Sequence, residues 1–200
     1  MTKRDQNERR ILEAAIEIIE AKGAAGLRII DVLERSHTQA PMLYRVFRNR
    51  EGLVIAAQRE RYERQMAGHG NAIVDALEKS LDSTELRQRF TALLDEYLVV
   101  EYSHTRLTRV NVIGSSQNRP ELVASIAQSD LMLFDKIALA LQAAAARGVV
   151  RRDLAYREFV AWYLGQLNGR ILIELDPSHY NQLTWNEIFR DATFSVLFDR

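Results

Sequence analysis

Apolar residues recur at helical spacing along most of the chain. In the first segment, Ile11, Leu12, Ala15 and Ile18 lie on one helical stripe, and Gly23 follows where a helix commonly ends. The 200 residues contain only three prolines and nine glycines, and alternating β-branched runs are few. The pattern therefore predicts an all-α protein of about nine helices.

The expected helices begin at recognisable signals. Pro41 and Pro120 lie in first turns, where a missing amide hydrogen is harmless. Asn49 is a suitable N-cap for a long fourth helix, which we expect to weaken at His69 and Gly70. We place this helix at about 49–69 and the others at about 6–22, 29–35, 40–47, 71–81, 84–102, 106–115, 120–147, 154–175 and 184–198.

Composition narrows the classes of function. The absence of cysteine excludes disulfides, thiolate metal sites and cysteine nucleophiles. The four histidines, at 37, 69, 104 and 179, show no metal-ligand spacing, and no phosphate loop or catalytic motif is present. The apolar runs are far shorter than the roughly 18 residues of a membrane span, and we find no secretory signal. We therefore expect a cytoplasmic protein that is not an enzyme and uses no metal or cofactor.

Charge is distributed unevenly along the sequence. The net charge is +0, but residues 1–50 hold ten Lys/Arg against seven Asp/Glu, which gives +3 and leaves −3 for the remainder. A weakly basic N-terminal segment joined to an acidic body fits a protein that presents one end to phosphates. Chance also accounts for an asymmetry of this size.

Residues 29–47 predict a helix-turn-helix. Two short helices, separated only by Ser36–Gln39, follow one packing helix and precede a longer one. The second short helix needs apolar support from behind, and we assign this role to Val32, Leu33, Leu43, Val46 and Phe47. The side chains left on exposed faces and ends are Gln39, Ala40, Met42, Tyr44, Arg45 and Arg48.

The same region resembles the N-terminal domain of the TetR family. In order and spacing it is similar to the family's Ala-Ala first helix, glycine turn, Asp-Ile second helix, Leu-Tyr-x-x-Phe recognition helix and Lys-Glu-x-Leu fourth helix. The resemblance covers about residues 9–57 and implies two domains, a DNA-binding domain at 1–50 and a ligand-binding and dimerisation domain at 51–200. The residues that carry it are Arg10–Ala15, Gly23, Asp31, Val32, Leu43–Phe47 and Arg50–Leu53.

The resemblance also implies roles for individual residues. Tyr44 would donate its hydroxyl to a DNA phosphate, and Arg50, in the family's lysine position, would clamp another. Arg28 and Arg48 are candidates for further phosphate contacts. The residues expected to face the major groove are Gln39, Ala40, Met42 and Arg45.

The turn of the helix-turn-helix departs from the family pattern. His37, Thr38 and Gln39 stand where the family usually has Gly-Val-Ser, and Leu27 and Arg28 stand where it usually has Thr-Thr. These changes remove expected helix caps, each typically worth about 1 kcal/mol. They leave open an alternative function, in which a TetR-like dimer has weakened or lost operator binding and acts as an interaction protein.

The two C-terminal helices are apolar on several faces, which indicates either a monomer core or an interface across a two-fold axis. The family resemblance favours the homodimer, which would bind a palindromic operator, and it implies a small-molecule effector. The expected interface residues are Trp162, Leu164, Leu167, Ile171, Trp185, Ile188, Phe189, Ala192 and Val196. The candidate ligand contacts are Tyr97, His104, Arg106, Asn111, Phe134, Trp162, Tyr163, Gln166 and Arg170, although packing is the commoner role for each.

Overall fold

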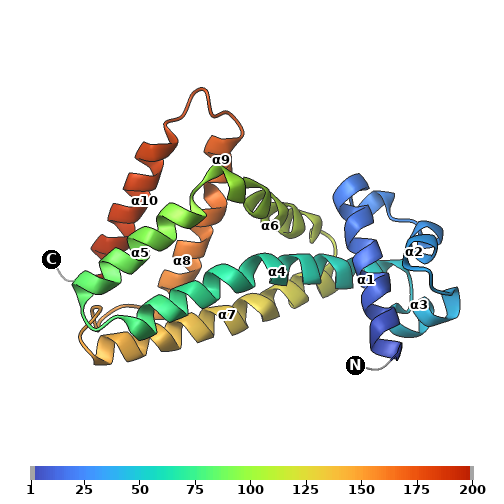
Figure 1. Cartoon of the computed structure of the whole chain (residues 1–200), viewed down its shortest axis with the longest axis horizontal. Helices are drawn as coiled ribbons and strands as arrows, with labels where there is room; N and C mark the ends of the chain where they lie inside the picture. Colours follow the sequence, from blue (N-terminus) through green and yellow to red (C-terminus); the bar gives the residue numbers. More distant parts are fainter. Residues whose placement is uncertain (1–2, 199–200) are drawn as a thin grey trace. The chain divides into compact units, whose positions relative to one another are not determined.

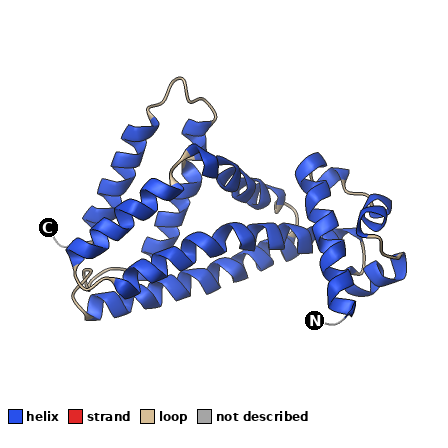
Figure 2. Ribbon diagram, in the orientation of Figure 1, coloured by secondary structure: helices blue, strands red, loops and turns tan. Residues whose placement is uncertain are grey.

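The computed structural model describes residues 3–198, and this part of the chain is helical without any strand, as the sequence predicts (Figures 1 and 2). None of its helices combines the length and the apolar character that a membrane crossing requires. The elements are α1 (Lys3–Lys22), the 3-10 helix η1 (Ala24–Gly26), α2 (Ile29–Ser36), α3 (Ala40–Phe47), α4 (Arg50–Lys79), α5 (Ser83–Tyr97), the 3-10 helix η2 (Val100–Tyr102), α6 (Ser103–Ser115), α7 (Pro120–Ala146), α8 (Tyr156–Gly169), α9 (Ile171–Glu174) and α10 (Gln182–Leu197).

The break expected at His69 and Gly70 is wrong, because α4 continues through both residues to Lys79. His69 is buried, and Gly70 packs so closely against Leu133 that an added Cβ would lie 2.4 Å from the leucine Cδ1. The glycine therefore permits a close helix approach and does not end the helix. The expected helix at 154–175 is instead divided into α8 and the short α9.

The chain forms two compact units, and the boundary differs from the one expected at residue 50. The first unit contains the residues up to Arg64 together with Val112–Ile126, and the second contains Gln65–Asn111 and the residues from Ala127 onward. The first turns of α4 belong to the first unit because Leu53 and Val54 are buried in its core. The segment Val112–Ile126 of the first unit begins within α6 and ends within α7.

The core of the first unit supports the helix-turn-helix from behind. Val32, Leu43 and Phe47 are buried, while Leu33 and Val46 are half-buried and pack against the same cluster. All five anchors expected from the sequence therefore lie in or against this core. They belong to one continuous apolar cluster with residues of α1, of α4 and of the connection before α2, namely Ile11, Ala14, Ala15, Ile16, Ile18, Ile19, Leu27, Leu53, Val54 and Ala57.

The second unit contains a buried triad of two arginines and one glutamate. Glu174 forms ion pairs with both Arg106 and Arg170, and all three side chains are less than a tenth exposed. Arg106 also donates to the carbonyls of Tyr97 and Val99, at 2.6 and 2.9 Å. Because a buried charge without partners is strongly unfavourable, these bonds fix the ends of α5, α6 and α9 relative to one another.

Aromatic rings fill the interior of the second unit. His69 on α4 lies edge-on to Tyr97, with ring centroids 4.2 Å apart, and its Nε2 lies 3.2 Å from the Tyr163 hydroxyl. Tyr163 in turn contacts Phe90 on α5 and Phe189 on α10. Burial lowers the pKa of His69 to about 3, and the positive charge of Arg109 acts in the same direction. The imidazole is therefore neutral at physiological pH.

We expect the stability of the protein to fall in mild acid because of His69. Its pKa lies below the ordinary value of 6.5, so below about pH 6.5 the unfolded chain takes up a proton that the folded chain refuses. Between pH 7.5 and 5.0 this should remove about 2 kcal/mol from the free energy of unfolding. Urea unfolding at several pH values measures it. In His69→Gln the same acidification should cost about 2 kcal/mol less, and an unchanged pH dependence in this variant would contradict the assignment.

Candidate nucleic-acid interface

The turn between α2 and α3 closes without the glycine that is usual there. His37 adopts a left-handed conformation, with φ 51° and ψ 44°, and its amide donates to the Glu34 carbonyl. The Thr38 amide donates to the Leu33 carbonyl at 3.2 Å, and the hydroxyls of Ser36 and Thr38 lie 2.6 Å apart. These bonds form the two-bond helix end that glycine normally favours. The unusual residues therefore leave the helix-turn-helix intact.

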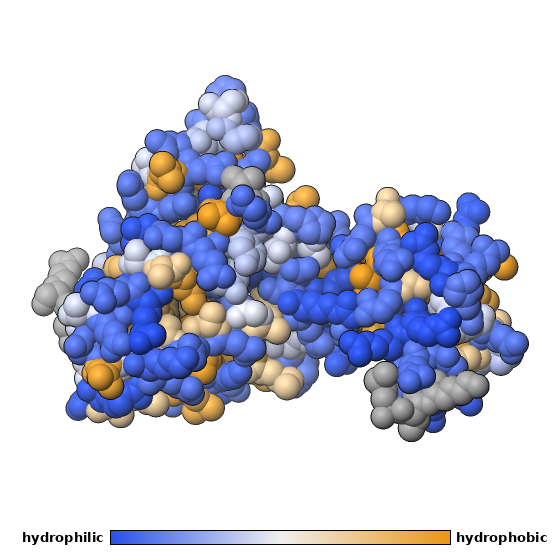
Figure 3. All heavy atoms as spheres, viewed as in Figure 1, coloured by the Kyte–Doolittle hydropathy of each residue, from blue (hydrophilic) through white to orange (hydrophobic). Residues whose placement is uncertain are grey.

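Helix α3 is exposed on the side opposite its apolar anchors. Tyr44 is 48% exposed, and Arg45 and Gln39 are also exposed, whereas Ala40 and Met42 are half-buried. The Arg45 Nη2 lies 2.8 Å from the Met42 sulfur, so these two side chains share one part of the surface. On the face drawn in Figure 3, hydrophilic residues cover most of the first unit. The exposed side of α3 thus offers hydrogen-bonding groups and cationic charge to a partner.

The N-termini of α2 and α3 have no side-chain caps, as expected from the departures in sequence. Arg28 and Gln39 occupy the two N-cap positions in extended conformations, and neither side chain bonds a helix amide. The first amides of α2 therefore remain available to an external acceptor, whereas in α3 Pro41 has no amide hydrogen and the Met42 amide already donates to the Gln39 carbonyl. A phosphate oxygen is well suited to this position, because helix N-termini carry partial positive charge. Arg28 itself is exposed beside the first of these ends.

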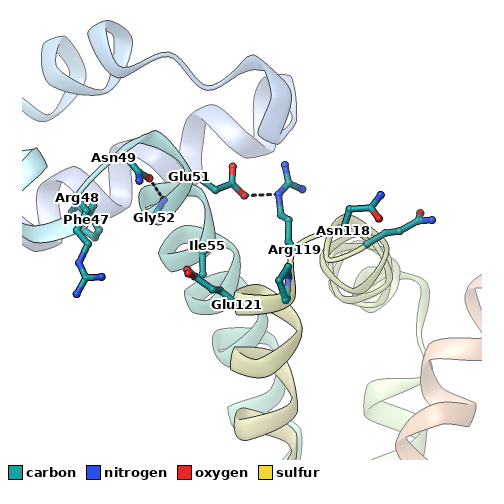
Figure 4. Close-up of a pocket in the computed structure, with 11 residues that line it drawn as sticks. Phe47, Arg48, Asn49, Glu51, Gly52, Ile55, Asn118, Arg119 and Glu121 are labelled. Carbon is teal, nitrogen blue, oxygen red and sulfur yellow. Dashed lines mark hydrogen bonds and ion pairs between the residues drawn. The ribbon is translucent and has the colours of Figure 1, made fainter.

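The junction between α3 and α4 is tight and strained. Arg48, which is exposed, has φ 66° and ψ −52°, and the Asn49 amide donates across it to the Phe47 carbonyl at 2.8 Å, which forms a γ-turn. Asn49 Oδ1 accepts from the Gly52 amide at 2.8 Å, which confirms the predicted cap (Figure 4). A Cβ on Gly52 would lie 2.2 Å from the Phe47 carbonyl oxygen. Glycine is therefore required at this position.

Arg50 has a structural role that the sequence did not reveal. Its Nε donates to the Leu27 carbonyl at 2.8 Å, and its Nη2 donates to the carbonyls of Ala24 and Ala25 at 2.7 and 3.1 Å. These bonds tie the first turn of α4 to the connection between α1 and α2. The expected phosphate contact of Arg50 stays a prediction, and only Nη1 carries none of these bonds.

A groove on α1 adds cationic residues that the sequence analysis did not select. It encloses about 550 Å³ beside the end of α2, and it is lined by Arg9, Arg10 and His37 together with two acidic residues of α1. Those acids are paired within the unit, Glu17 with Arg35 and Glu13 with Arg64. Arg9 and Arg10 therefore contribute to the basic character of this side of the unit. The charge excess of residues 1–50 was the signal that could have identified them.

A second pocket, which we name the junction pocket, adjoins the strained turn at Arg48. It encloses about 640 Å³ and lies wholly within the first unit (Figure 4). One wall comes from the α3–α4 junction and the other from the turn before α7. An ion pair joins the two walls, with Arg119 Nε 2.7 Å from Glu51 Oε1. The lining residues are Phe47, Arg48, Asn49, Glu51, Gly52, Ile55, Gln117, Asn118, Arg119, Pro120 and Glu121.

The candidate ligand contacts are not gathered around one pocket. Arg106 and Arg170 are bound to Glu174, and Tyr97 and Tyr163 pack in the aromatic cluster. His104, Asn111 and Gln166 are exposed, while Phe134 and Trp162 are half-buried. Two surface pockets of the second unit are lined by none of these nine residues; one includes Gly148–Asp153 and the other includes Asp135 and Tyr156–Glu158.

The expected dimer interface needs correction at three residues. Leu164, Leu167 and Phe189 are buried within the protomer, so they have no surface to offer a partner. Ile188 is 63% exposed, and Trp162, Ile171, Trp185, Ala192 and Val196 are half-buried. Four further large apolar side chains, which the sequence pattern did not single out, are more than half exposed here, namely Leu172, Leu175, Tyr180 and Leu183.

Comparison with known proteins finds a matching family and solved structures with a similar fold. The family described as "Bacterial regulatory proteins, tetR family" matches residues 11–57. A putative TetR-family transcriptional regulator from Rhodococcus sp. aligns over 96% of this chain and 99% of its own, with 22% identity and a TM-score of 0.71. Another from Mesorhizobium loti aligns over 97% and 96%, with 14% identity and a TM-score of 0.73. A comparison with curated proteins gives no match.

The helix-turn-helix and the family match over residues 11–57 support a DNA-binding transcriptional regulator. More particularly, residues 11–57 match the TetR family, as the sequence resemblance indicated, and the chain shares its fold with solved TetR-family regulators. The family match covers the helix-turn-helix and the first turns of α4. The structural likeness extends the same fold over the remainder of the chain.

We expect Arg50→Met to lower the free energy of unfolding by about 2–4 kcal/mol, because three backbone carbonyls lose a charged donor. Urea unfolding measures the loss. Arg59→Met is the matched control, since Arg59 is exposed and pairs only with its neighbour Glu63 on α4. The control should cost less than about 0.5 kcal/mol. Equal losses in the two variants would show that the tie to the α1–α2 connection contributes nothing.

Proposed function

We propose that the protein is a ligand-responsive repressor that binds a palindromic operator as a homodimer. The observation that supports this most directly is the α3 surface, where Tyr44 and Arg45 are exposed on a short helix held from behind by buried Leu43 and Phe47. A short helix supported in this way is what entry into a major groove requires. The alternative of an interaction protein is less well supported, because the divergent turn at His37 still closes as a normal helix-turn-helix turn.

On DNA, the side chains of α3 would divide between base edges and backbone. Gln39 and Arg45 would donate to base edges, whereas Ala40 and Met42 would meet thymine methyl groups. The residues in the backbone role would be Arg28, Tyr44, Arg48 and the remaining Nη1 of Arg50. The uncapped amides at the start of α2 would add a further phosphate site.

The dimer would form through the exposed apolar surface of α9 and α10. Leu172, Leu183 and Ile188 are between 63% and 72% exposed, and apolar exposure of this extent is typical of an interface. A two-fold axis through this surface would present two α3 helices to one duplex. Palindromic half-sites about 34–36 Å apart would then be read together.

An effector would bind in the second unit and alter the tilt of α4. Structures with the same fold include EbrR complexed with ethidium, a Saccharomonospora viridis regulator in complex with choline, and Bacillus subtilis FadR in complex with stearoyl-CoA. Their ligands differ widely, so the fold alone does not select one. A coupling of about 1–3 kcal/mol between the ligand and DNA would suffice for regulation.

We expect substitutions at Arg45 and Arg48 to separate base contacts from phosphate contacts. With DNA from beside the gene, Arg48→Ala should weaken specific and non-specific binding alike and reduce the salt slope by about 0.9. Arg45→Ala should cost about 1–3 kcal/mol on the specific site alone. Fluorescence anisotropy between 50 and 300 mM KCl, roughly the range in which such contacts weaken, measures both effects. Arg59→Ala serves as the control. If the wild type shows no preference for any sequence, the interaction protein is the better description.

Ile188→Glu should convert the dimer into a monomer, because each two-fold interface would bury two new charges. Sedimentation velocity at micromolar concentration distinguishes the two states. Leu81→Glu places the same charge at a residue that is 84% exposed in the loop after α4, and it should leave the dimer intact. A wild-type protein that sediments as a monomer would refute the proposed interface.

A further inference from the structure

The junction pocket has strained backbone on both of its walls. Residues 3–198 include three non-glycine residues with positive φ, and two of them line this pocket: Arg48 at 66° and Asn118 at 63°. Such conformations cost about 1–3 kcal/mol each and gather at ligand clamps and switches. The volume of about 640 Å³ also lies in the range of small-molecule sites. Strain on two separate segments therefore marks the pocket as more than a gap between helices.

The charges of the junction pocket are balanced but not all paired. Glu51 and Arg119 bind each other, and Arg119 also donates to the Ser115 carbonyl. Arg48 and Glu121 make no side-chain hydrogen bond or ion pair within the described chain, and Figure 4 shows both without a marked interaction. One cation and one anion are thus left available on different walls of the same pocket.

The uncharged part of the lining limits what can bind. Phe47, Ile55 and Pro120 contribute apolar surface, while Gln117 and Asn118 contribute amides. A purely anionic ligand would satisfy Arg48 but would bring its charge towards Glu121, and a purely cationic ligand would have the reverse problem. A molecule that carries both charges and a short apolar group satisfies every part of the lining.

We propose that the junction pocket is a second small-molecule site, specific for an α-amino acid with an apolar side chain. Its carboxylate would bind the Arg48 guanidinium in the bidentate geometry that favours arginine, and its ammonium group would bind Glu121. Its side chain would pack against Phe47, Ile55 and Pro120. This site lies in the first unit and is separate from the effector site proposed in the second.

Occupation of the junction pocket has a consequence for DNA binding, and this step rests on the proposed function. The Arg48 side chain is a candidate phosphate contact, and it cannot bind a ligand carboxylate and a DNA phosphate with the same donors. A bound amino acid therefore competes with the operator for Arg48. The regulator would respond to an amino acid from within its DNA-binding unit.

Calorimetric titration of the full-length protein tests the ligand class with three matched probes. L-leucine carries both charges, 4-methylpentanoate lacks the ammonium group, and 3-methylbutylamine lacks the carboxylate. We expect L-leucine to bind at least about tenfold more tightly than either analogue, since each lost charge-assisted bond costs about that factor. Equal affinities, or no binding by any of the three, would overturn the proposal.

Two variants locate the site. Glu121→Gln removes the anion from an exposed position and should weaken L-leucine binding about tenfold while leaving DNA binding unchanged. Glu78→Gln, at an exposed position in the second unit, should bind L-leucine as the wild type does. An equal loss in both variants, or none in Glu121→Gln, would refute the site. Selective binding of L-leucine by a protein that does not bind DNA would uphold the site and refute only the proposed function.

Discussion

The placement of the recognition helix depends on the hydrogen bonds of Arg50. Its guanidinium binds the carbonyls of Ala24, Ala25 and Leu27, and so joins the first turn of α4 to the chain segment that leads into α2. Helix α3 is connected to α4 only through Arg48 and Asn49. Without this tie, α3 would be held by the turns at its two ends and by the apolar cluster behind it, and apolar contacts are non-directional. Directional bonds from Arg50 supply the angular restraint that a DNA-reading helix needs.

The α3–α4 junction gains rigidity at the cost of local strain. The γ-turn at Arg48 brings the Phe47 carbonyl against the start of α4. This close approach leaves no space for a Cβ on Gly52. Asn49 then caps α4 in the only stretch between the two helices. Because only two residues separate the helices, α3 and the first turn of α4 are held close together. The Glu51–Arg119 ion pair connects the same turn to the segment before α7, within the same compact unit.

Local features of the chain were predictable from sequence, whereas contacts between distant residues were not. The anchors Leu43 and Phe47 and the Asn49 cap follow from spacing and residue type, and the structure has all three. The continuation of α4 through Gly70 was not predictable, because a glycine in a helical pattern suits either a helix end or a close contact with another residue, and here it lies against Leu133. Leu164 shows the same limit. The sequence placed it at a dimer interface, but it is buried by packing within the protomer. Periodicity identifies an apolar face but not what covers it.

The interior of the second unit constrains how the proposed effector can act. The side chains of Tyr163, Arg106 and Arg170 already bind other groups of the protein, so a ligand that reaches them has to replace those bonds. Arg106 and Arg170 share Glu174, and a ligand that displaced this carboxylate would have to supply an anion in its place. A neutral aromatic ligand would instead have to open the ring cluster around His69. In either case the proposed ligand would have to stabilise a rearranged interior, which is the differential affinity that a shift between two conformations requires.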